Sequence, residues 1–361
     1  MRIVLDARKY FDFGIGTYIQ NLVQNLYSLC SLGLIVSPQD RSKIDHYPSV
    51  ELKENASGKY SLSELFSISS DVQQMNATIF HSPHYTVPLN IKVPIVTTIH
   101  DILHVRGKLY FPLQKRMYAR VMVKHACSVS SAIIVDSEFT KTELLDEFNI
   151  SSEKVHVIYL GVSKEYTKNV SEEEIRIFRN KYDLKKSFVL YTGGLKSHKN
   201  VLTLLQAFSQ LLNRKEYQLV FSGESIRENK TIAEIIKKNN LLADVVDIGR
   251  VSRKELVIAY KEASVVVLPS LYEGFGFSVL EAMASGTPAI GARAASLPEV
   301  IGDAGILFDP YSSEELSTVL AKVLTDNDLR KSMIQRGYEN VKKFTWEACA
   351  KNTFQLYQNI L

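Results

Sequence analysis

Apolar residues in the first half of the chain fall into short β-branched runs separated by longer stretches that repeat every three to four residues. A strand buried on both faces of a parallel sheet is a short continuous apolar run, whereas an amphipathic helix repeats about every 3.6 residues. The runs predict strands at 2–6, 33–37, 77–81, 94–98, 132–136 and 155–158. The repeating stretches predict helices at 16–30, 62–75, 113–127 and 138–148.

The same alternation returns in the second half. Strands are predicted at 188–192, 218–222, 245–248, 264–268, 288–292 and 305–308. Helices are predicted at 200–213, 230–241, 253–261 and 277–284. Two such series indicate an α/β protein with two doubly wound parallel-sheet domains. The polar, aperiodic segment 161–172 is the expected link between them.

A last helix is predicted at 346–361. Its apolar residues are spaced for one stripe: Trp346, Ala350, Phe354, Tyr357 and Leu361. From these residues alone, the simplest interpretation is a core helix of the second domain.

The stretch 265–292 is organised as strand, loop, helix, turn and strand. Its two acids are Glu273 on the loop and Glu281 on the helix. Glycines at the helix start allow backbone N–H groups to approach an anion closely. A carboxylate on each side of an anion site suggests a ligand with both hydroxyls and phosphates. Equally, Glu273 could cap the helix and Glu281 could be solvated, and the residues alone leave both interpretations open.

The pattern P-S-x-x-E-G-F-G-x-x-x-x-E-A-M-A-x-G-x-P in this stretch resembles the signature of retaining, nucleotide-sugar-dependent glycosyltransferases of family four, which have the GT-B fold. The match continues through 296–300 and 304–310. The resemblance implies two Rossmann-like domains facing a cleft. The acceptor-side domain would be 1–165 with helix 346–361 packed back on it, and the nucleotide-sugar domain would be 172–345.

The resemblance also assigns roles in the site. His100, in the motif T-I-H-D at a strand end, and Glu273 would lie at the reaction centre. The residues expected to bind the nucleotide-sugar are Gly16, Lys199, Arg250, Val251, Gly274, Phe275, Gly276, Phe277 and Glu281. In this scheme Glu281 holds the ribose, Glu273 holds the sugar hydroxyls, and Lys199 with Gly16 faces the diphosphate. The turn 249–252 would contact the nucleobase through its backbone.

The loop 191–200 departs from the family pattern at one position. Many members carry an arginine five residues before the loop lysine, where this sequence has Gly194. Lys199 is therefore the main expected cation, with His198 beside it as a helper. The glycines around Gly16 do not form a dinucleotide fingerprint, because Ile19 stands where the third glycine is needed.

Further polar residues end strands or begin helices. His81 and His84, in H-S-P-H-Y, are candidates for the acceptor side. Ser137 resembles the family's S-x-x-T, and helix capping is a sufficient explanation for it. Asp326 and Asp328 form a D-x-D sequence, which we interpret as a helix start rather than a metal site. No metal and no cofactor besides the donor are expected.

The length and composition of the chain limit the classes of protein that it can belong to. A length of 361 residues fits two domains, and a net charge of +4 is too small to indicate nucleic acid. Three distant cysteines show neither a disulfide framework nor zinc spacing, which favours a reducing cytosol. The first residues lack the anatomy of a signal peptide, and no apolar run reaches about 18 residues.

The segment 102–135 contains no acid but six Lys and Arg residues. On the predicted helix, Arg116, Arg120 and Lys124 share one face. Two interpretations remain: a solvated face beside a core face, or contact of 106–124 with an anionic membrane surface. Related enzymes often act on lipid-linked acceptors, which supports the second interpretation and a peripheral location on the inner membrane face.

The expected activity is transfer of a hexose from a nucleotide-diphospho-sugar to a glycan or lipid-linked acceptor, with retention, in polysaccharide or glycolipid assembly. The resemblance favours mannose from GDP-mannose, with glucose or another hexose as alternatives. Other classes stay open: a GT-B epimerase or phosphorylase, and a non-catalytic nucleotide-sugar binder. A dehydrogenase-like protein is disfavoured by the missing third glycine.

Overall fold

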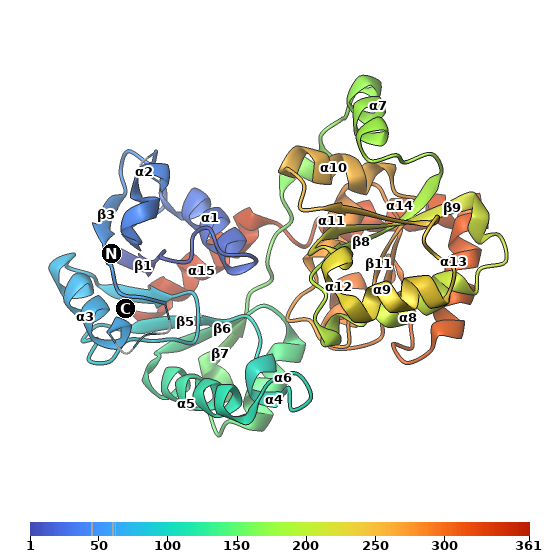
Figure 1. Cartoon of the computed structure of the whole chain (residues 1–361). Coiled ribbons are helices and arrows are strands. Elements are labelled where there is room, and N and C mark those ends of the chain that lie inside the picture. Colours follow the sequence, from blue (N-terminus) through green and yellow to red (C-terminus); the bar gives the residue numbers. More distant parts are fainter. Residues whose placement is uncertain (45, 60, 62) are drawn as a thin grey trace. The chain divides into compact units, whose positions relative to one another are not determined.

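The chain forms two compact units, shown in Figure 1. The computed structural model describes all residues except 45, 60 and 62. Unit 1 is Met1–Gly161 with Thr345–Leu361, and unit 2 is Val162–Phe344. The predicted start of helix 62–75 lies outside the described residues. Each unit is built on its own parallel sheet, so the predicted α/β class with two Rossmann-like domains is confirmed.

The described residues of unit 1 form a seven-stranded sheet in the order β3-β2-β1-β4-β5-β6-β7. The strands are β1 (Arg2–Asp6), β2 (Ser31–Val36), β3 (Glu51–Glu54), β4 (Ile79–Ser82), β5 (Ile95–Ile99), β6 (Ala132–Val135) and β7 (Val155–Val157). All neighbouring strands are parallel. The strand β3 was not predicted, because its sequence E-L-K-E is polar. An edge strand can be polar, since it is not enclosed on both sides.

Helices cover both faces of this sheet. They are α1 (Ile15–Leu26), α2 (Arg41–Ile44), α3 (Glu64–Gln74), α4 (Leu103–Arg106), α5 (Leu113–Val129), α6 (Glu138–Glu147) and α15 (Trp346–Ile360). In Figure 1, α4, α5 and α6 lie on one side of the sheet and α1 and α15 on the other. Right-handed crossovers require this division, because the strand order reverses direction at β1.

The last helix, α15, belongs to unit 1. It packs against α1, and its Tyr357 is fully buried with the hydroxyl hydrogen-bonded to His81. Its buried residues Trp346, Ala350 and Tyr357 therefore face the core of the first domain, as the family resemblance implied, and not that of the second.

Unit 2 contains a six-stranded sheet in the order β10-β9-β8-β11-β12-β13. The strands are β8 (Ser187–Gly193), β9 (Tyr217–Gly223), β10 (Val245–Gly249), β11 (Val265–Leu268), β12 (Ala289–Ala292) and β13 (Ile306–Phe308). The helices are α7 (Glu172–Lys181), α8 (Val201–Ser209), α9 (Lys230–Lys238), α10 (Arg253–Glu262), α11 (Phe277–Ala284), α12 (Leu297–Ile301), α13 (Ser313–Thr325) and α14 (Asn327–Val341). The side chain of Asp326 accepts the N–H of Leu329 and caps α14, as the interpretation of the D-x-D sequence required.

Short 3-10 helices connect several of these elements. They are η1 (Pro38–Asp40), η2 (Ser152–Lys154), η3 (Lys164–Thr167), η4 (Ser197–Lys199), η5 (Arg214–Glu216) and η6 (Ile226–Glu228).

The predicted link 161–172 is not a simple connector. From Val162 onward it belongs to unit 2, and it contains η3. Tyr166 in η3 is fully buried, whereas its neighbours Glu165 and Thr167 are exposed. The polar pattern of the segment therefore comes from the exposed neighbours of Tyr166. For this reason the sequence did not indicate that Tyr166 is buried.

Candidate active site

The carboxyl ends of β8 and β11 bring Lys199 and Glu273 into contact. These strands are adjacent in the sheet, so the loops that follow them emerge at the same edge. Lys199 Nζ lies 2.7 and 2.9 Å from the two carboxylate oxygens of Glu273. Ser270 Oγ donates to Glu273 Oε1 at 2.6 Å. The Lys199 and Glu273 side chains remain 23% and 14% exposed, so a ligand can reach both.

The start of α11 is built by Gly276. Its φ of +112° lies in the left-handed region, and a Cβ there would come within 2.7 Å of Leu297 Cδ2. Ser296 Oγ donates to the carbonyls of Glu273 and Phe275, at 3.0 and 2.9 Å. These bonds fix the loop from Gly274 to Phe277 against the body of unit 2. The arrangement directs the positive end of α11 toward a site for an anion.

Neither alternative interpretation of the two acids holds. Glu273 does not cap α11, because Gly276 occupies the N-cap position and no side chain bonds there. Glu281 is not solvated. Tyr166 OH donates to its Oε1 and Tyr260 OH to its Oε2, both at 2.7 Å. Burial raises the pKa of Glu281, and the hydrogen bonds from Tyr260 and Tyr166 oppose that rise.

Arg250 and Val251 follow β10 in a turn that begins at Gly249, whose φ is +61°. Ser222 Oγ donates to the carbonyl of Gly249 at 3.2 Å. Ser252 then caps α10 in a reciprocal capping box with Glu255. The turn is thus held from both sides, with Arg250 exposed and Val251 partly exposed. Its contact with a nucleobase remains a prediction.

His198 packs into the protein beside this site. Its ring is buried, and its carbonyl accepts the N–H of Leu271 at 2.8 Å. It therefore ties the Lys199 loop to the Glu273 loop. Of the side chains in the 191–200 loop, Lys199 is the one that reaches Glu273.

In unit 1, His100 and Asp136 form a buried pair at the ends of β5 and β6. His100 Nδ1 lies 2.6 Å from Asp136 Oδ2. Within the described residues, His100 Nε2 is buried and has no hydrogen-bond partner. Burial alone would lower the pKa of His100, but the Asp136 carboxylate outweighs it and holds that pKa above its ordinary value. The pair therefore fixes the orientation of the His100 ring.

The two upstream histidines are structural. His81 is fully buried, and its Nδ1 and Nε2 bond to Tyr357 OH and to Thr98 Oγ1. Burial lowers the pKa of His81 to about 3. The expectation that His81 lines an acceptor surface is therefore wrong, because both ring nitrogens are used inside the core. His84 is also buried, and its Nδ1 lies 3.3 Å from Thr86 Oγ1.

Ser137 is a helix cap. Its side chain accepts the N–H of Thr140 at 3.1 Å at the start of α6. The capping interpretation is confirmed.

Comparison with known proteins identifies the chain. The family described as Glycosyltransferase Family 4 matches residues 14–166, and the family Glycosyl transferases group 1 matches residues 172–340. The chain is 31% identical over 274 residues to an uncharacterized glycosyltransferase of Methanocaldococcus jannaschii, covering 74% of this chain and 70% of the relative. The chain belongs to the family-four glycosyltransferases.

A second relative of this glycosyltransferase matches it from end to end. The O-antigen chain mannosyltransferase B of Escherichia coli is 29% identical over 372 residues, covering 97% of each chain. Two solved structures share the fold at 18% identity and a TM-score of 0.81. One is a glycosyltransferase from Rickettsia africae, with coverage of 99% of this chain and 98% of that one. The other is Anabaena HepE in complex with UDP and glucose, with coverage of 99% and 100%.

Gly16 of the glycosyltransferase has a different role from the one expected. Its N–H donates to the carbonyl of Asp12 at 2.8 Å, so it is not presented to a phosphate. A Cβ at this position would lie 2.5 Å from the carbonyl oxygen of Tyr10. Gly16 is therefore required because the loop before α1 packs closely onto the helix.

Several buried charges of the glycosyltransferase were missed. Arg8, just after β1, donates to the two Asp6 oxygens at 2.9 and 2.7 Å, and its Nη2 lies 3.5 Å from Glu64. Burial lowers the pKa of the adjacent Lys9 to about 8. Asp136 was missed as well. The sequence feature that could have indicated Asp136 is an acid at the carboxyl end of a strand. That strand lies beside the strand that ends just before His100.

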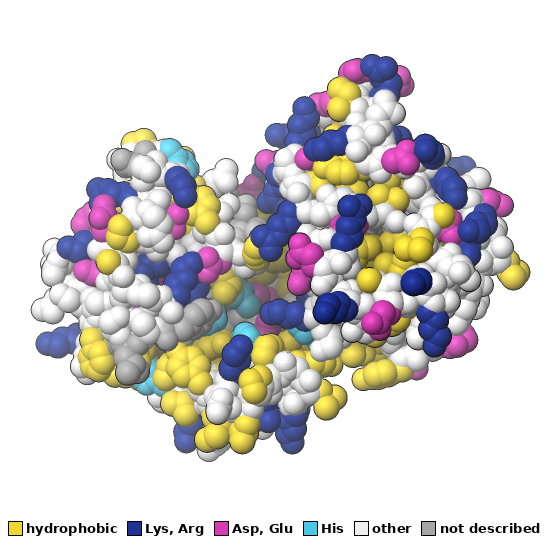
Figure 2. Space-filling model, in the orientation of Figure 1, with side chains coloured by type: hydrophobic (Ala, Val, Ile, Leu, Met, Phe, Trp, Pro, Cys, Tyr) yellow, Lys and Arg dark blue, Asp and Glu magenta, His cyan; other side chains and the backbone are white. Residues whose placement is uncertain are grey.

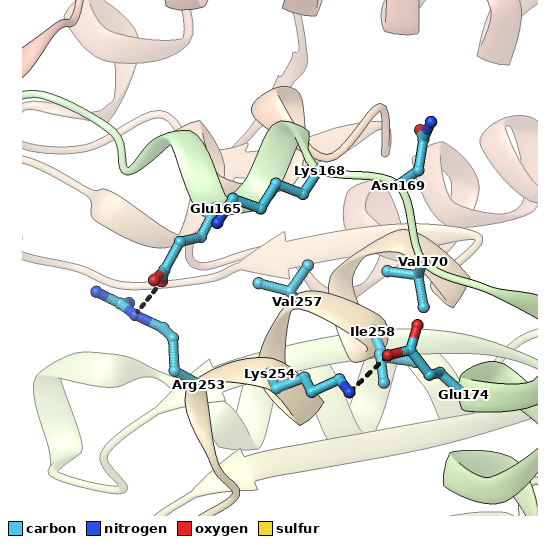
Figure 3. Close-up of a pocket in the computed structure, with 9 residues that line it drawn as sticks. All are labelled: Glu165, Lys168, Asn169, Val170, Glu174, Arg253, Lys254, Val257 and Ile258. Atoms are coloured by element: carbon cyan, nitrogen blue, oxygen red, sulfur yellow. Dashed lines mark ion pairs between the residues drawn. The ribbon is translucent and has the colours of Figure 1, made fainter.

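A pocket of about 410 Å³ lies on unit 2 of the glycosyltransferase between η3, α7 and α10 (Figure 3). Its lining residues are Glu165, Lys168, Asn169, Val170, Glu174, Arg253, Lys254, Val257 and Ile258. Two ion pairs cross it: Arg253 Nε to Glu165 at 3.2 Å, and Lys254 to Glu174 at 2.5 Å. None of the residues predicted for the site lines this pocket. In the described part of the chain, no group of three His, Cys, Asp or Glu residues is arranged for a metal ion.

Proposed function

We propose that this glycosyltransferase transfers a hexosyl group, with mannose favoured, from a nucleotide-diphospho-sugar to an acceptor hydroxyl with retention. The observation that carries the proposal is the Lys199–Glu273 pair at the strand edge where α11 begins. The similarity of the chain to O-antigen chain mannosyltransferase B favours mannose as the sugar. We propose GDP-mannose as the donor and polysaccharide or glycolipid assembly as the setting.

In the proposed reaction, the bond between sugar C1 and the phosphate oxygen breaks, and a bond from C1 to the acceptor oxygen forms. The acceptor proton passes to the leaving phosphate. Lys199 and the N-terminus of α11 offset the negative charge that develops on the diphosphate, which removes the need for a metal. Glu273 accepts hydrogen bonds from the sugar hydroxyls and Glu281 from the ribose. Unit 1 is the proposed acceptor-binding domain, with His100 directly after strand β5 of its sheet.

A panel of nucleotide-sugars tests the donor. Slow hydrolysis releases a nucleoside diphosphate without an acceptor, so GDP-mannose is expected to give the fastest release. Faster release of UDP from UDP-glucose would show that the donor carries glucose and uracil instead. No release from any donor, together with interconversion of sugar epimers or a requirement for inorganic phosphate, would contradict transfer and favour an epimerase or phosphorylase.

Replacing Lys199 with alanine is expected to weaken binding of free GDP by roughly 10- to 100-fold. A hydrogen bond to a charged group contributes about 1.5–3 kcal/mol, and Lys199 is the side-chain cation closest to Glu273 in the site. Titration calorimetry measures the change. Lys196→Ala, on the same loop but exposed, is the matched control. Unchanged heats for Lys199→Ala would exclude its proposed contact with the diphosphate.

We also propose that unit 1 contacts an anionic membrane surface through the region around α5. The core-facing residues of α5 are Ala119, Val123, Ala126 and Cys127. Four apolar residues instead point to solvent: Leu109 at 90% exposure, Leu113 at 64%, Met117 at 59% and Val121 at 58%. Figure 2 shows apolar and basic side chains together where α4 and α5 lie at the foot of unit 1.

Two groups of basic residues lie here besides Arg116, whose Nε donates to the Val105 carbonyl at 3.4 Å. Arg106 and Arg120 pair with Glu143 and Glu147 on α6. Lys108, Lys115 and Lys124 form no ion pair with the described residues. Free cations beside exposed apolar side chains match a surface of anionic headgroups. No helix among the described residues is long and apolar enough to cross a bilayer.

Reversing the three lysines to Lys108→Glu, Lys115→Glu and Lys124→Glu is expected to abolish binding to vesicles that contain phosphatidylglycerol. Each basic residue contributes about 1 kcal/mol near such a surface, so the loss should exceed roughly 100-fold. Co-sedimentation measures it, with pure phosphatidylcholine vesicles as the lipid control. The variant Lys331→Glu, Lys351→Glu reverses exposed lysines elsewhere and should bind normally. Equal binding of all three proteins would contradict the membrane contact.

A further inference from the structure

Two buried tyrosines hold the carboxylate of Glu281. Tyr166 and Tyr260 are fully buried, their rings meet edge to face at 5.4 Å, and each hydroxyl donates to a different oxygen of Glu281. We propose that Tyr166 and Tyr260 are positioning residues that orient Glu281 to receive the nucleotide. The inference rests on the proposed function, in which Glu281 binds the ribose.

The direction of the hydrogen bond from Tyr166 to Glu281 follows from the neighbouring Arg253. Arg253 Nη1 donates to Tyr166 OH at 2.9 Å, and a guanidinium can only donate. The single proton of the Tyr166 hydroxyl is therefore left for Glu281. Arg253 Nη1 also lies 3.8 Å from Glu281 Oε1. Its Nε pairs with Glu165, so the guanidinium is fixed on the rim of the pocket in Figure 3.

A second set of contacts ties Tyr260 to the start of α11. Thr192 Oγ1, at the end of β8, lies 2.7 Å from Tyr260 OH and 2.8 Å from Ser278 Oγ. Ser278 is in the first turn of α11. The orientation of Glu281 is thus coupled to the strand end and to the helix start that face the proposed diphosphate.

The arrangement leaves acceptor capacity on Glu281. An ionised carboxylate offers about four lone-pair positions, and the tyrosines use one on each oxygen. The side chain is still 16% exposed. One open acceptor on each oxygen suits two adjacent hydroxyls, provided that the carboxylate cannot rotate or take up a proton. The two tyrosine hydroxyls hold one oxygen each, which opposes rotation, and they donate to the charged form, which opposes the rise that burial causes in the pKa of Glu281.

The test uses Tyr166→Phe and Tyr260→Phe, which keep the rings and remove one hydroxyl each. We expect GDP binding to weaken by about tenfold in each variant, as measured by calorimetry at pH 7. The charged and titratable groups around Glu281 are Tyr166 and Glu165 from η3 and Tyr260 and Arg253 from α10. Without one tyrosine hydroxyl, Glu281 should bind a proton at higher pH. The loss of affinity should therefore grow between pH 7 and pH 5 in the variants more than in the wild type.

Four further variants make the outcome decisive. Tyr217→Phe removes another buried tyrosine hydroxyl of unit 2, which donates to the Leu324 carbonyl, and should bind GDP normally. Glu281→Gln tests the proposed function itself: binding at wild-type strength would show that Glu281 does not hold the nucleotide. If Glu281→Gln binds weakly but both phenylalanine variants match wild type in affinity and pH profile, the positioning role is overturned. If a phenylalanine variant does not fold, Thr192→Val and Arg253→Gln remove the supporting contacts and must show the same pH-dependent weakening.

Discussion

Replacing Glu273 with glutamine is expected to lower turnover by about two to three orders of magnitude and to leave GDP affinity intact or slightly higher. Glu273 is proposed to accept hydrogen bonds from the transferred sugar, which strengthen as charge develops at C1. Loss of one such fixed electrostatic contact costs about 100- to 1,000-fold in turnover. GDP lacks the transferred hexose, so its affinity should not fall. Glutamine also releases Lys199 from its 2.7 Å ion pair, so Lys199 can turn fully to the diphosphate.

Steady-state kinetics with the donor found by the panel, together with GDP calorimetry, measure the two effects separately. Glu224→Gln is a matched control, because Glu224 lies on the neighbouring loop and accepts the Leu195 N–H at 2.8 Å. Its turnover should stay within a few-fold of wild type. An unchanged turnover in Glu273→Gln would remove Glu273 from the reaction centre. A parallel loss of GDP affinity would show that Glu273 serves the nucleotide instead.

The strands of both units could be predicted because their sequences are apolar on both faces. Val265–Leu268 is one example, since all four residues are buried and β8 and β12 flank the strand. The edge strand Glu51–Glu54 could not be predicted, since its exposed side chains carry no such pattern. Periodicity therefore identifies enclosed strands and misses those at the rim.

The contacts between the site residues and their partners could not be predicted from the sequence. Lys199 and Glu273 are 74 positions apart, and their contact depends on β8 and β11 being neighbours in a sheet whose order the sequence does not state. Asp136 was overlooked for the same reason, because only the adjacency of β5 and β6 brings it to His100. Tyr166 was hidden in a segment with the composition of a linker.

Two residues show how a motif can be located correctly and explained wrongly. The glycine at position 16 is required, but by the nearby carbonyl of Tyr10 rather than by a phosphate. On α5, Arg116, Arg120 and Lys124 were expected to lie beside a core face, yet the apolar Met117 and Val121 of this helix are exposed. Spacing on one helix shows which residues share a face, but not what covers that face.

Replacing Asp136 with asparagine is expected to lower turnover by about 100-fold and to change its pH dependence. The carboxylate holds the His100 ring and raises its pKa, and a misplaced catalytic group can cost about 100-fold. In the variant, Asp101 is the remaining carboxylate that opposes burial, so the pKa of His100 should fall. The pH profile of turnover is therefore expected to shift toward acid, and the His100 ring signals in an NMR titration should shift with it.

The same pair predicts a pH-dependent stability. Because the folded-state pKa of His100 is raised, its pairing with Asp136 loses its stabilising contribution as the pH rises through the raised value. The difference in thermal midpoint between wild type and Asp136→Asn should thus shrink above neutrality, and it should also shrink in acid, because burial raises the pKa of Asp136 and the carboxylate becomes protonated there. Asp101→Asn is the comparison: the Asp101 charge also raises the pKa of His100, but its side chain bonds to the Leu103 N–H, so the effect should be smaller than that of Asp136→Asn. If His100→Ala and Asp136→Asn act as one unit, the double variant should lose no more turnover than His100→Ala alone. Additive losses, or a pH profile that does not move, would separate Asp136 from the function of His100.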